Sequence, residues 1–325
     1  MPESFFKWIA SSDRKRPHRL ARPDDVKLRI AQLTDPHVPS DIPLLRRLRD
    51  LMRPHASASS LSHELSAISN ELSQPYRRKR KIYTNLLKKA LLGLRRLDVD
   101  HLAITGDLAH CGLASEFLEI KATLSITGWN RNNKLTVIPG NHDRFNLYER
   151  IPQDPMESFF DVVQARTPRV KTLPGGVVLV EIDSNSDRDD DRHYMEKWLP
   201  NTVGKIYPEV LDFLEKQQGA LLGSRIILLI HHHVSMDWYA RKTTRDLGGL
   251  MNPAEGIDEL LEAARLIDPH AILLHGHIHE TMPVDYTYNN HMIGNPGGFA
   301  ETLRMNIFDV NTNDEITMTQ IELRS

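Results

Sequence analysis

The chain has 325 residues, of which 40% are hydrophobic and 26% are charged, and it contains one cysteine, Cys111. A chain of this length can bury a substantial core without staples, and a single cysteine excludes both a disulfide framework and a cysteine-based zinc site. No apolar run of about 18 residues is present, and the N-terminal stretch lacks the apolar core of a signal peptide. We therefore expect a cytoplasmic protein that does not span a membrane.

The net charge of −2 is the sum of a basic N-terminal part and an acidic remainder. Residues 1–96 carry 21 Lys and Arg against 9 Asp and Glu, a balance of +12, whereas residues 97–325 carry 20 against 34, a balance of −14. The run 77–81 consists of five basic residues. Such a run is most often a solvated helix face, but it also suits contact with an anionic membrane surface. The acidic part is where we expect metal ions.

The first 26 residues read as an N-terminal arm, because a short apolar cluster is followed by a polar, basic and proline-punctuated segment. A strand is predicted at 28–33. A helical insertion then covers about 42–97, where apolar residues recur at helical spacing in three stretches separated by Pro54 and Pro75. This insertion suits packing or dimerisation, and its basic character also suits a membrane surface.

The remainder of 27–325 is predicted to form one α/β domain. Short, nearly continuous apolar runs indicate strands that are covered on both faces. They lie at 101–105, 134–138, 177–182, 225–230 and 271–274, with helical patterns at 115–125 and 255–267 between them. Strands that alternate with helices favour a layered α/β fold.

Residues that can ligate a metal follow five of the six predicted strands. They are Asp35 and His37, Asp107, the group Asn141, His142 and Asp143, the triple histidine 231–233, and finally His275, His277 and His279. Eight of the 16 histidines lie in these clusters. Because ligands in open α/β sheets bind beyond the carboxyl ends of the strands, we expect the five clusters to converge on one crevice.

The last cluster contains two histidines separated by one residue. In a continuing strand the side chains of His277 and His279 would point to opposite faces, so the backbone must turn there. We expect Gly276 to supply the conformational freedom for that turn.

The donor types also limit the metal. Imidazole, carboxylate and amide oxygen without thiolate suit Mn, Fe, Zn or Ni rather than a structural zinc. Two Asp, one Asn and at least four His exceed the needs of one ion and suit two ions, about 3.5–4 Å apart, that share a carboxylate. The sequence has no Walker-type loop, no Gly-x-Ser-x-Gly elbow and no His-Glu-x-x-His, so nucleophilic Ser or Cys catalysis has no support.

In order and spacing, the five clusters resemble the motif blocks of the calcineurin-like metallophosphoesterases, over roughly residues 27–310. The resemblance implies a four-layer α/β/β/α sandwich with two metal ions, Mn or Fe in first place and Zn or Ni as alternatives. Carried over position by position, it assigns Asp35, His37 and His279 to the first metal, Asp107 to a bridging position, and Asn141, His232 and His277 to the second metal. His142 would face the substrate and Asp143 would orient His142.

Two assignments stay open. The triple histidine allows a shift of one residue, so His231 is an alternative to His232 as the ligand from the fourth block. His110 lies three residues after Asp107, where purple acid phosphatases of the superfamily carry a coordinating Tyr. A histidine that packs beside the site is the more common situation.

The implied reaction is metal-assisted hydrolysis of a phosphodiester or phosphoanhydride in a small-molecule substrate. The block 104–108, with 112–113 and 116–117, is most similar to members that resemble cyclic-nucleotide phosphodiesterases. The helical insertion departs from their pattern and is similar to members that cleave UDP-diacylglucosamine at a membrane. A homo-oligomer through the insertion is a further expectation. We rank a nuclease and an inactive metal-binding scaffold lower: aromatic residues near the basic run are sparse, and all the positions that carry the chemistry are present.

Overall fold

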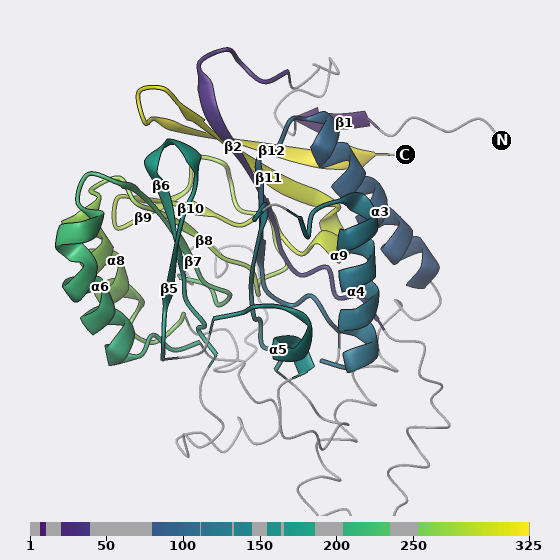
Figure 1. Ribbon diagram of the computed structural model, residues 1–325, viewed down its shortest axis with the longest axis horizontal. Coiled ribbons are helices and arrows are strands. Elements are labelled where there is room, and N and C mark those ends of the chain that lie inside the picture. Colours follow the sequence, from purple (N-terminus) through teal and green to yellow (C-terminus); the bar gives the residue numbers. More distant parts are fainter. Residues whose placement is uncertain are drawn as a thin grey trace, which may run out of the picture.

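A computed structural model describes residues 7–10, 21–39, 80–110, 112–131, 133–144, 155–163, 166–185, 204–234 and 253–324. Within these ranges the protein forms two six-stranded sheets that pack face to face, and helices cover both outer faces (Figure 1). The predicted four-layer α/β/β/α sandwich is confirmed. Among the described residues, no helix is long and apolar enough to cross a membrane.

The first sheet combines the predicted strands near the N-terminus with the C-terminal hairpin. Its order is β1 (Lys7–Ala10), β12 (Ile316–Arg324), β11 (Arg304–Asn311), β2 (Val26–Leu33), β3 (His101–Thr105) and β4 (Leu135–Ile138). Strands β2, β3 and β4 are parallel, so their carboxyl ends meet at one edge. Helices α3 (Arg80–Arg96) and α4 (Ala114–Thr127) cover the outer face.

The second sheet carries the other two ligand-bearing strands. Its order is β5 (Arg169–Thr172), β6 (Val177–Glu181), β7 (Arg225–Leu229), β8 (Ile272–Leu274), β10 (His291–Gly294) and β9 (Thr287–Tyr288). Helices α6 (Pro208–Leu221) and α8 (Ile257–Ile267) pack on its outer face, at the left of Figure 1. Three short elements complete the described chain: α5 (Pro155–Phe159), η2 (Pro174–Gly176) and α9 (Phe299–Thr302).

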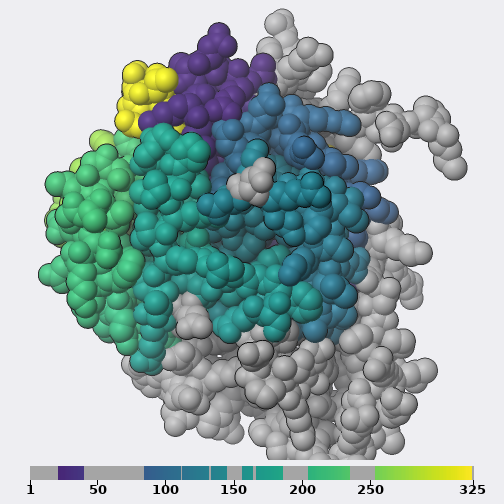
Figure 2. Space-filling view, viewed as in Figure 1, coloured from purple at the N-terminus to yellow at the C-terminus, as the bar shows by residue number. Residues whose placement is uncertain are grey.

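Burial on both faces explains why the strands read as continuous apolar runs. In β2, Leu28 and Ile30 join the core between the two sheets, whereas Ala31 and Leu33 join the core under α3 and α4. The alternation follows from the two-residue period of a strand. Figure 2 shows the turn before β2, in purple, beside the turn between β11 and β12, in yellow, and the Thr312 amide donates to the Asp25 carbonyl there at 2.9 Å.

Several expected elements have different bounds or lie outside the described residues. The third stretch of the expected insertion is helix α3, with Leu87, Leu91 and Leu94 buried, whereas 42–79 lies outside the described residues. Of the expected arm, residues 7–10 form β1 and pair with β12. The sequence reading missed α6, whose buried Val210 and Leu214 give only a narrow apolar stripe.

An ion pair between a buried arginine and a half-buried aspartate joins the two central strands of the first sheet. Arg29 of β2 is 2% exposed and lies directly opposite Asp309 of β11. Its Nε and one terminal nitrogen donate to the two carboxylate oxygens at 2.6 and 2.7 Å, and the other donates to the Leu97 carbonyl at 2.9 Å. The guanidinium thus fixes β11 and the chain after α3 against β2.

Removing one partner of this pair should therefore destabilise the protein strongly. We expect Arg29→Met to lower the free energy of unfolding by about 3–5 kcal/mol, because the Asp309 carboxylate stays behind with little solvent. Urea unfolding followed by circular dichroism measures this loss, and Arg29→Met with Asp309→Leu should recover part of it. Arg265→Met, which breaks the exposed pair with Glu262 on α8, is the control and should have little effect. Equal losses in both single variants would contradict the role given to Arg29.

Candidate metal centre

The turns after β2 and β3 continue the pairing of those two parallel strands. The Asp35 amide donates to the Gly106 carbonyl at 3.1 Å, and the His37 amide donates to the Asp107 carbonyl at 3.0 Å. These bonds place Asp35, His37 and Asp107 side by side just beyond the sheet edge. All three are buried, with Asp35 at 0% and Asp107 at 1% exposure.

Four donors from three loops converge on a first centre. They are Asp35, His37, Asp107 and His279, and each offers one ligand atom within 4.8 Å of the others. The Nε2 atoms of His37 and His279 face each other at 3.0 Å. The Asp35 Oδ1 atom lies 3.5 Å from His279 Nε2, and Asp107 Oδ2 lies 3.6 Å from His37 Nε2. Ring nitrogens and carboxylate oxygens that face one another in this way fit a cation.

A second set of donors lies on the other side of Asp107. The Oδ1 atom of Asn141 is 3.0 Å from both His231 Nε2 and His277 Nδ1. The Asp107 Oδ1 atom lies 3.4 Å from His231 Nε2, so each oxygen of this carboxylate faces a different set. This is the arrangement that a carboxylate shared by two ions requires.

The geometry favours His231 over His232, the residue first expected, as the ligand from the fourth block. The ring of His232 is turned so that Nδ1 lies 2.8 Å from the Ser184 hydroxyl, whereas His231 Nε2 faces Asn141 and Asp107. His231 Nδ1 lies 2.8 Å from the Thr105 carbonyl. A carbonyl oxygen only accepts hydrogen bonds, so Nδ1 carries a proton. Nε2 is then the ring nitrogen that can bind a metal.

Four of the proposed ligands have a left-handed backbone. The φ angles are 50° for Asp35, 42° for His37, 52° for Asp107 and 67° for His277. Asp and His adopt this region more readily than most residues, at a cost of about 1–3 kcal/mol each, and such strain gathers at functional sites. The sequence had suggested that Gly276 makes the turn at the last block. The left-handed residue there is instead His277.

Gly276 is needed for a different reason. A Cβ atom at this position would overlap the Thr34 hydroxyl and would lie 2.6 Å from Asp35 Oδ2. Thr34 needs that space, because its hydroxyl donates to Asp35 Oδ2 at 2.6 Å. The missing side chain lets the loop after β8 approach the loop after β2.

The role expected for Asp143 is also corrected. Its carboxylate accepts hydrogen bonds from the amides of Leu108, Ala109 and Gly140, at 3.2, 2.8 and 3.0 Å. The partner of His142 Nδ1 is instead the His110 carbonyl, at 2.8 Å. Asp143 thus holds the loops after β3 and β4 together, and the His110 carbonyl orients His142.

One supporting residue was not found from the sequence. Glu301, in α9, lies with Oε1 3.0 Å from His279 Nδ1, which leaves His279 Nε2 for the first centre. Carboxylate partners of this kind orient ligating histidines and raise their basicity. Glu301 lies 22 positions after His279 and outside every motif block, so only the folded chain shows the contact.

The buried charges of the two donor sets favour the binding of cations. Burial alone would lower the pKa of His231, but the Asp107 carboxylate and its hydrogen bond raise that pKa to about 9. For His279, burial is likewise outweighed by Asp35 and Glu301, which raise its pKa well above the usual range. Burial lowers the pKa of His37 and His277, helped by neighbouring histidines, so these two imidazoles are neutral. Two protons therefore lie where two cations would bind.

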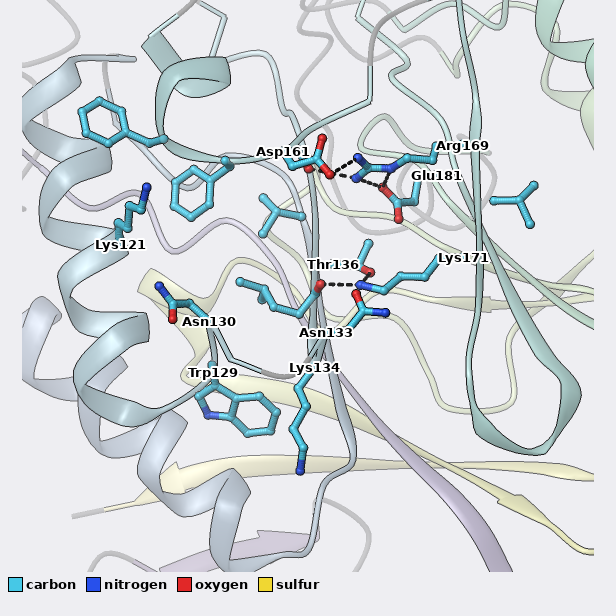
Figure 3. Close-up of a pocket in the computed structure, with 15 residues that line it drawn as sticks. Lys121, Trp129, Asn130, Asn133, Lys134, Thr136, Asp161, Arg169, Lys171 and Glu181 are labelled. Carbon is cyan, nitrogen blue, oxygen red and sulfur yellow. Dashed lines mark hydrogen bonds and ion pairs between the residues drawn. The ribbon is translucent and has the colours of Figure 1, made fainter.

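A separate cavity of about 430 Å³ lies between the start of β4 and the edge strand β5. Figure 3 shows Arg169 between Asp161 and Glu181, with ion pairs of 2.7 Å to Asp161 and 2.5 Å to Glu181. The Lys171 ammonium donates to the Leu135 carbonyl at 2.7 Å. None of the proposed metal ligands lines this cavity. Its charged groups tie the two sheet edges together, and it lies apart from the proposed metal centre.

A two-sheet sandwich with two donor sets around one carboxylate is typical of hydrolases that use two metal ions. The sequence profile described as calcineurin-like phosphoesterase matches residues 28–281. The chain therefore belongs to the calcineurin-like phosphoesterase family, which works with two metal ions, and it is a metal-dependent phosphoester hydrolase by class. No curated protein matches the chain.

Solved structures agree with this fold. A dimetal phosphatase from Danio rerio is similar over 92% of this chain and 97% of its own, with a TM-score of 0.57 and 14% identity. At that identity the likeness shows the fold alone. A purple acid phosphatase from yellow lupin seeds matches over 92% of this chain and 54% of its own, with 11% identity and a TM-score of 0.45, too low to carry an argument.

The raised pKa values predict that metal binding releases protons. Below about pH 9 the His231 imidazole holds a second proton, on Nε2, in the metal-free protein, and a cation must displace it. Apparent metal affinity should thus rise as the pH increases from 6 to 9, with about one to two protons released at pH 7. Titration calorimetry of Mn²⁺ in buffers of different ionisation enthalpy counts these protons.

The variant Glu301→Gln tests whether the raised pKa of His279 is the source of the released protons. It removes one of the carboxylates that raise the pKa of His279, so fewer protons should be released on metal binding. Metal binding without proton release, or with affinity that falls as pH rises, would contradict this account of the charges.

Proposed function

We propose that this protein is a binuclear metal-dependent phosphodiesterase that acts on a nucleotide-type small molecule. The observation that carries the proposal is the Asp107 carboxylate, whose two oxygens face two separate donor sets at 3.6 and 3.4 Å. Asp35, His37 and His279 would hold the first ion with Asp107. Asn141, His231 and His277 would hold the second.

The ions, Mn or Fe in first place and Zn or Ni as alternatives, would lower the pKa of a water to about 7 and neutralise charge on the phosphoryl group. The protein's own part is to place His142 at the substrate. Because His142 Nδ1 donates to the His110 carbonyl, we assign the substrate contact to Nε2. When protonated, Nε2 can stabilise a phosphoryl oxygen or donate a proton to the leaving oxygen.

The preference for a diester rests on the similarity of the block around Asp107 to members that resemble cyclic-nucleotide phosphodiesterases. One residue of that block has a structural role here. The Glu116 carboxylate accepts the Leu113 amide at 3.1 Å and caps α4, whose first residues follow the loop that carries His110. The cap fixes the course of that loop next to the site.

A second candidate is a pyrophosphatase that acts on a lipid-linked nucleotide, such as UDP-diacylglucosamine, at an anionic membrane surface. The observation in its favour is α3, which contains six Lys and Arg and no acidic residue. Leu92, on the same helix, is 38% exposed. A basic helix with an exposed apolar residue suits a membrane interface. A homo-oligomer through this region stays a prediction, and we do not propose nucleic acid as a partner.

A hydrolysis screen with added Mn²⁺ tests the proposal. The substrates are an aryl phosphodiester, cyclic nucleotides, a phosphomonoester and UDP-diacylglucosamine in detergent. We expect the diesters to be cleaved fastest, and we expect Asp107→Ala and His142→Ala each to reduce kcat/KM on the order of 10³-fold. Preference for the lipid-linked substrate would instead support the second candidate.

Asp258→Ala is the matched control, because Asp258 lies at the start of α8 and contacts Tyr288 and Asn289. Its activity should equal that of the unchanged protein. Full activity of a metal-loaded Asp107→Ala variant would contradict the proposed site. Two bound metals without hydrolysis of any of these substrates would show an inactive scaffold.

A further inference from the structure

One buried histidine beside the site has no role in the proposal so far. His110 is 8% exposed, and one of its ring nitrogens lies within 4.8 Å of ring nitrogens of both His37 and His142. Its ring stacks on that of His142, with centroids 5.8 Å apart and an interplanar angle of 25°. The ring of His37 stands across both. Three imidazoles thus face one small space next to the first donor set.

Three hydrogen bonds hold the backbone of residues 108–110 in place. Its amide donates to the Val38 carbonyl at 3.2 Å, and the Val38 amide donates to the Leu108 carbonyl at 2.8 Å. Asp143 accepts the Ala109 amide at 2.8 Å. These bonds extend the β2–β3 pairing up to His110 and fix its backbone, and the rings of His37 and His142 pack against its side chain.

The groups of donors separate His110 from the two carboxylates of the first centre, although His37 belongs to both groups. Among the described residues, His110 groups with His37 and His142, whereas the carboxylates of Asp35 and Asp107 belong to the group with His37 and His279. A cation held by His110 and His142 would have imidazoles and no carboxylate on that side. Two nitrogens no more than 4.8 Å apart can, however, both reach one oxygen placed about 2.8–3.0 Å from each.

We propose that His110 is a second substrate-contacting imidazole, which donates a hydrogen bond to a non-bridging phosphoryl oxygen that it shares with His142. A neutral imidazole carries one N–H, so the contact does not depend on a change of protonation. This role rests on the proposed phosphoesterase function and adds a substrate-binding residue to the same site. The shared oxygen is present in every phosphoester and in orthophosphate, which supplies a probe independent of turnover.

The side chain can be tested without disturbing His142, because the His110 carbonyl that orients His142 belongs to the backbone. His110→Phe keeps a stacked ring and loses the N–H, whereas His110→Gln keeps an N–H donor. Orthophosphate binding to the Mn²⁺-loaded protein, measured by calorimetry, should weaken about 10-fold in His110→Phe and no more than about 3-fold in His110→Gln. The kcat/KM for an aryl phosphodiester should follow the same order.

Metal content, measured by mass spectrometry on the same samples, should stay equal in all variants. His270→Phe, at an exposed position before β8, is the control and should change neither phosphate binding nor metal content. Unchanged phosphate affinity in His110→Phe overturns the proposal, and so does the loss of a metal equivalent, which would make His110 a ligand.

The two proposals can fail separately. Hydrolysis that persists with no effect of His110→Phe overturns only the role of His110. Phosphate binding that weakens in His110→Phe, in a protein that cleaves no phosphoester, supports His110 and overturns only the enzymatic function.

Discussion

The metal centre depends on how the negative charges of two buried carboxylates are balanced. Asp35 and Asp107 are almost fully excluded from water, and charges in such a place are costly unless positive charge lies close by. In the protein alone, protons on His231 and His279 supply that charge, which is why the pKa of each is raised. Metal ions would supply it more completely. The same demand explains why histidines and not lysines surround the carboxylates, since an imidazole can exchange its proton for a metal.

Meeting this demand requires backbone conformations that an ordinary strand end does not adopt. Four proposed ligands are left-handed, and the loops approach so closely that side chains at Gly140 and Gly276 would overlap Asp107 and Thr34. The rest of the fold offsets the cost. The pairing of β2 with β3 continues into both ligand loops, and Asp143 binds three amides from the loops after β3 and β4. A rigid sandwich therefore holds a strained edge in place.

Much of this arrangement follows from sequence by simple rules. Strands covered on both faces read as apolar runs, and parallel neighbours such as β2, β3 and β4 bring their carboxyl ends together. That is sufficient to expect Asp35, Asp107 and Asn141 in one place. The choice between His231 and His232 could not be made in the same way, because side chains alternate along a strand and the direction of the last residue depends on how the loop after β7 bends.

Contacts made by backbone atoms, or by residues far away in the sequence, could not be predicted from the sequence either. The partner of His142 is a backbone carbonyl, which every residue has, so no motif could mark it. The His279 partner, Glu301, belongs to a four-residue helix whose position is set by the fold. Gly276 was read as a turn residue, although the space it leaves for Thr34 is what matters. Sequence thus indicates which donors are present, and packing decides which atoms face one another.

The central claim is that Asp107 joins two donor sets, one with Asp35, His37 and His279 and the other with Asn141, His231 and His277. A crystal structure of the Mn²⁺-loaded protein, with anomalous diffraction data, tests it most directly. We expect two anomalous peaks, both in contact with Asp107, with the second against His231 and not His232. A single peak, or a second peak bound by His232 with His231 turned away, would contradict the account.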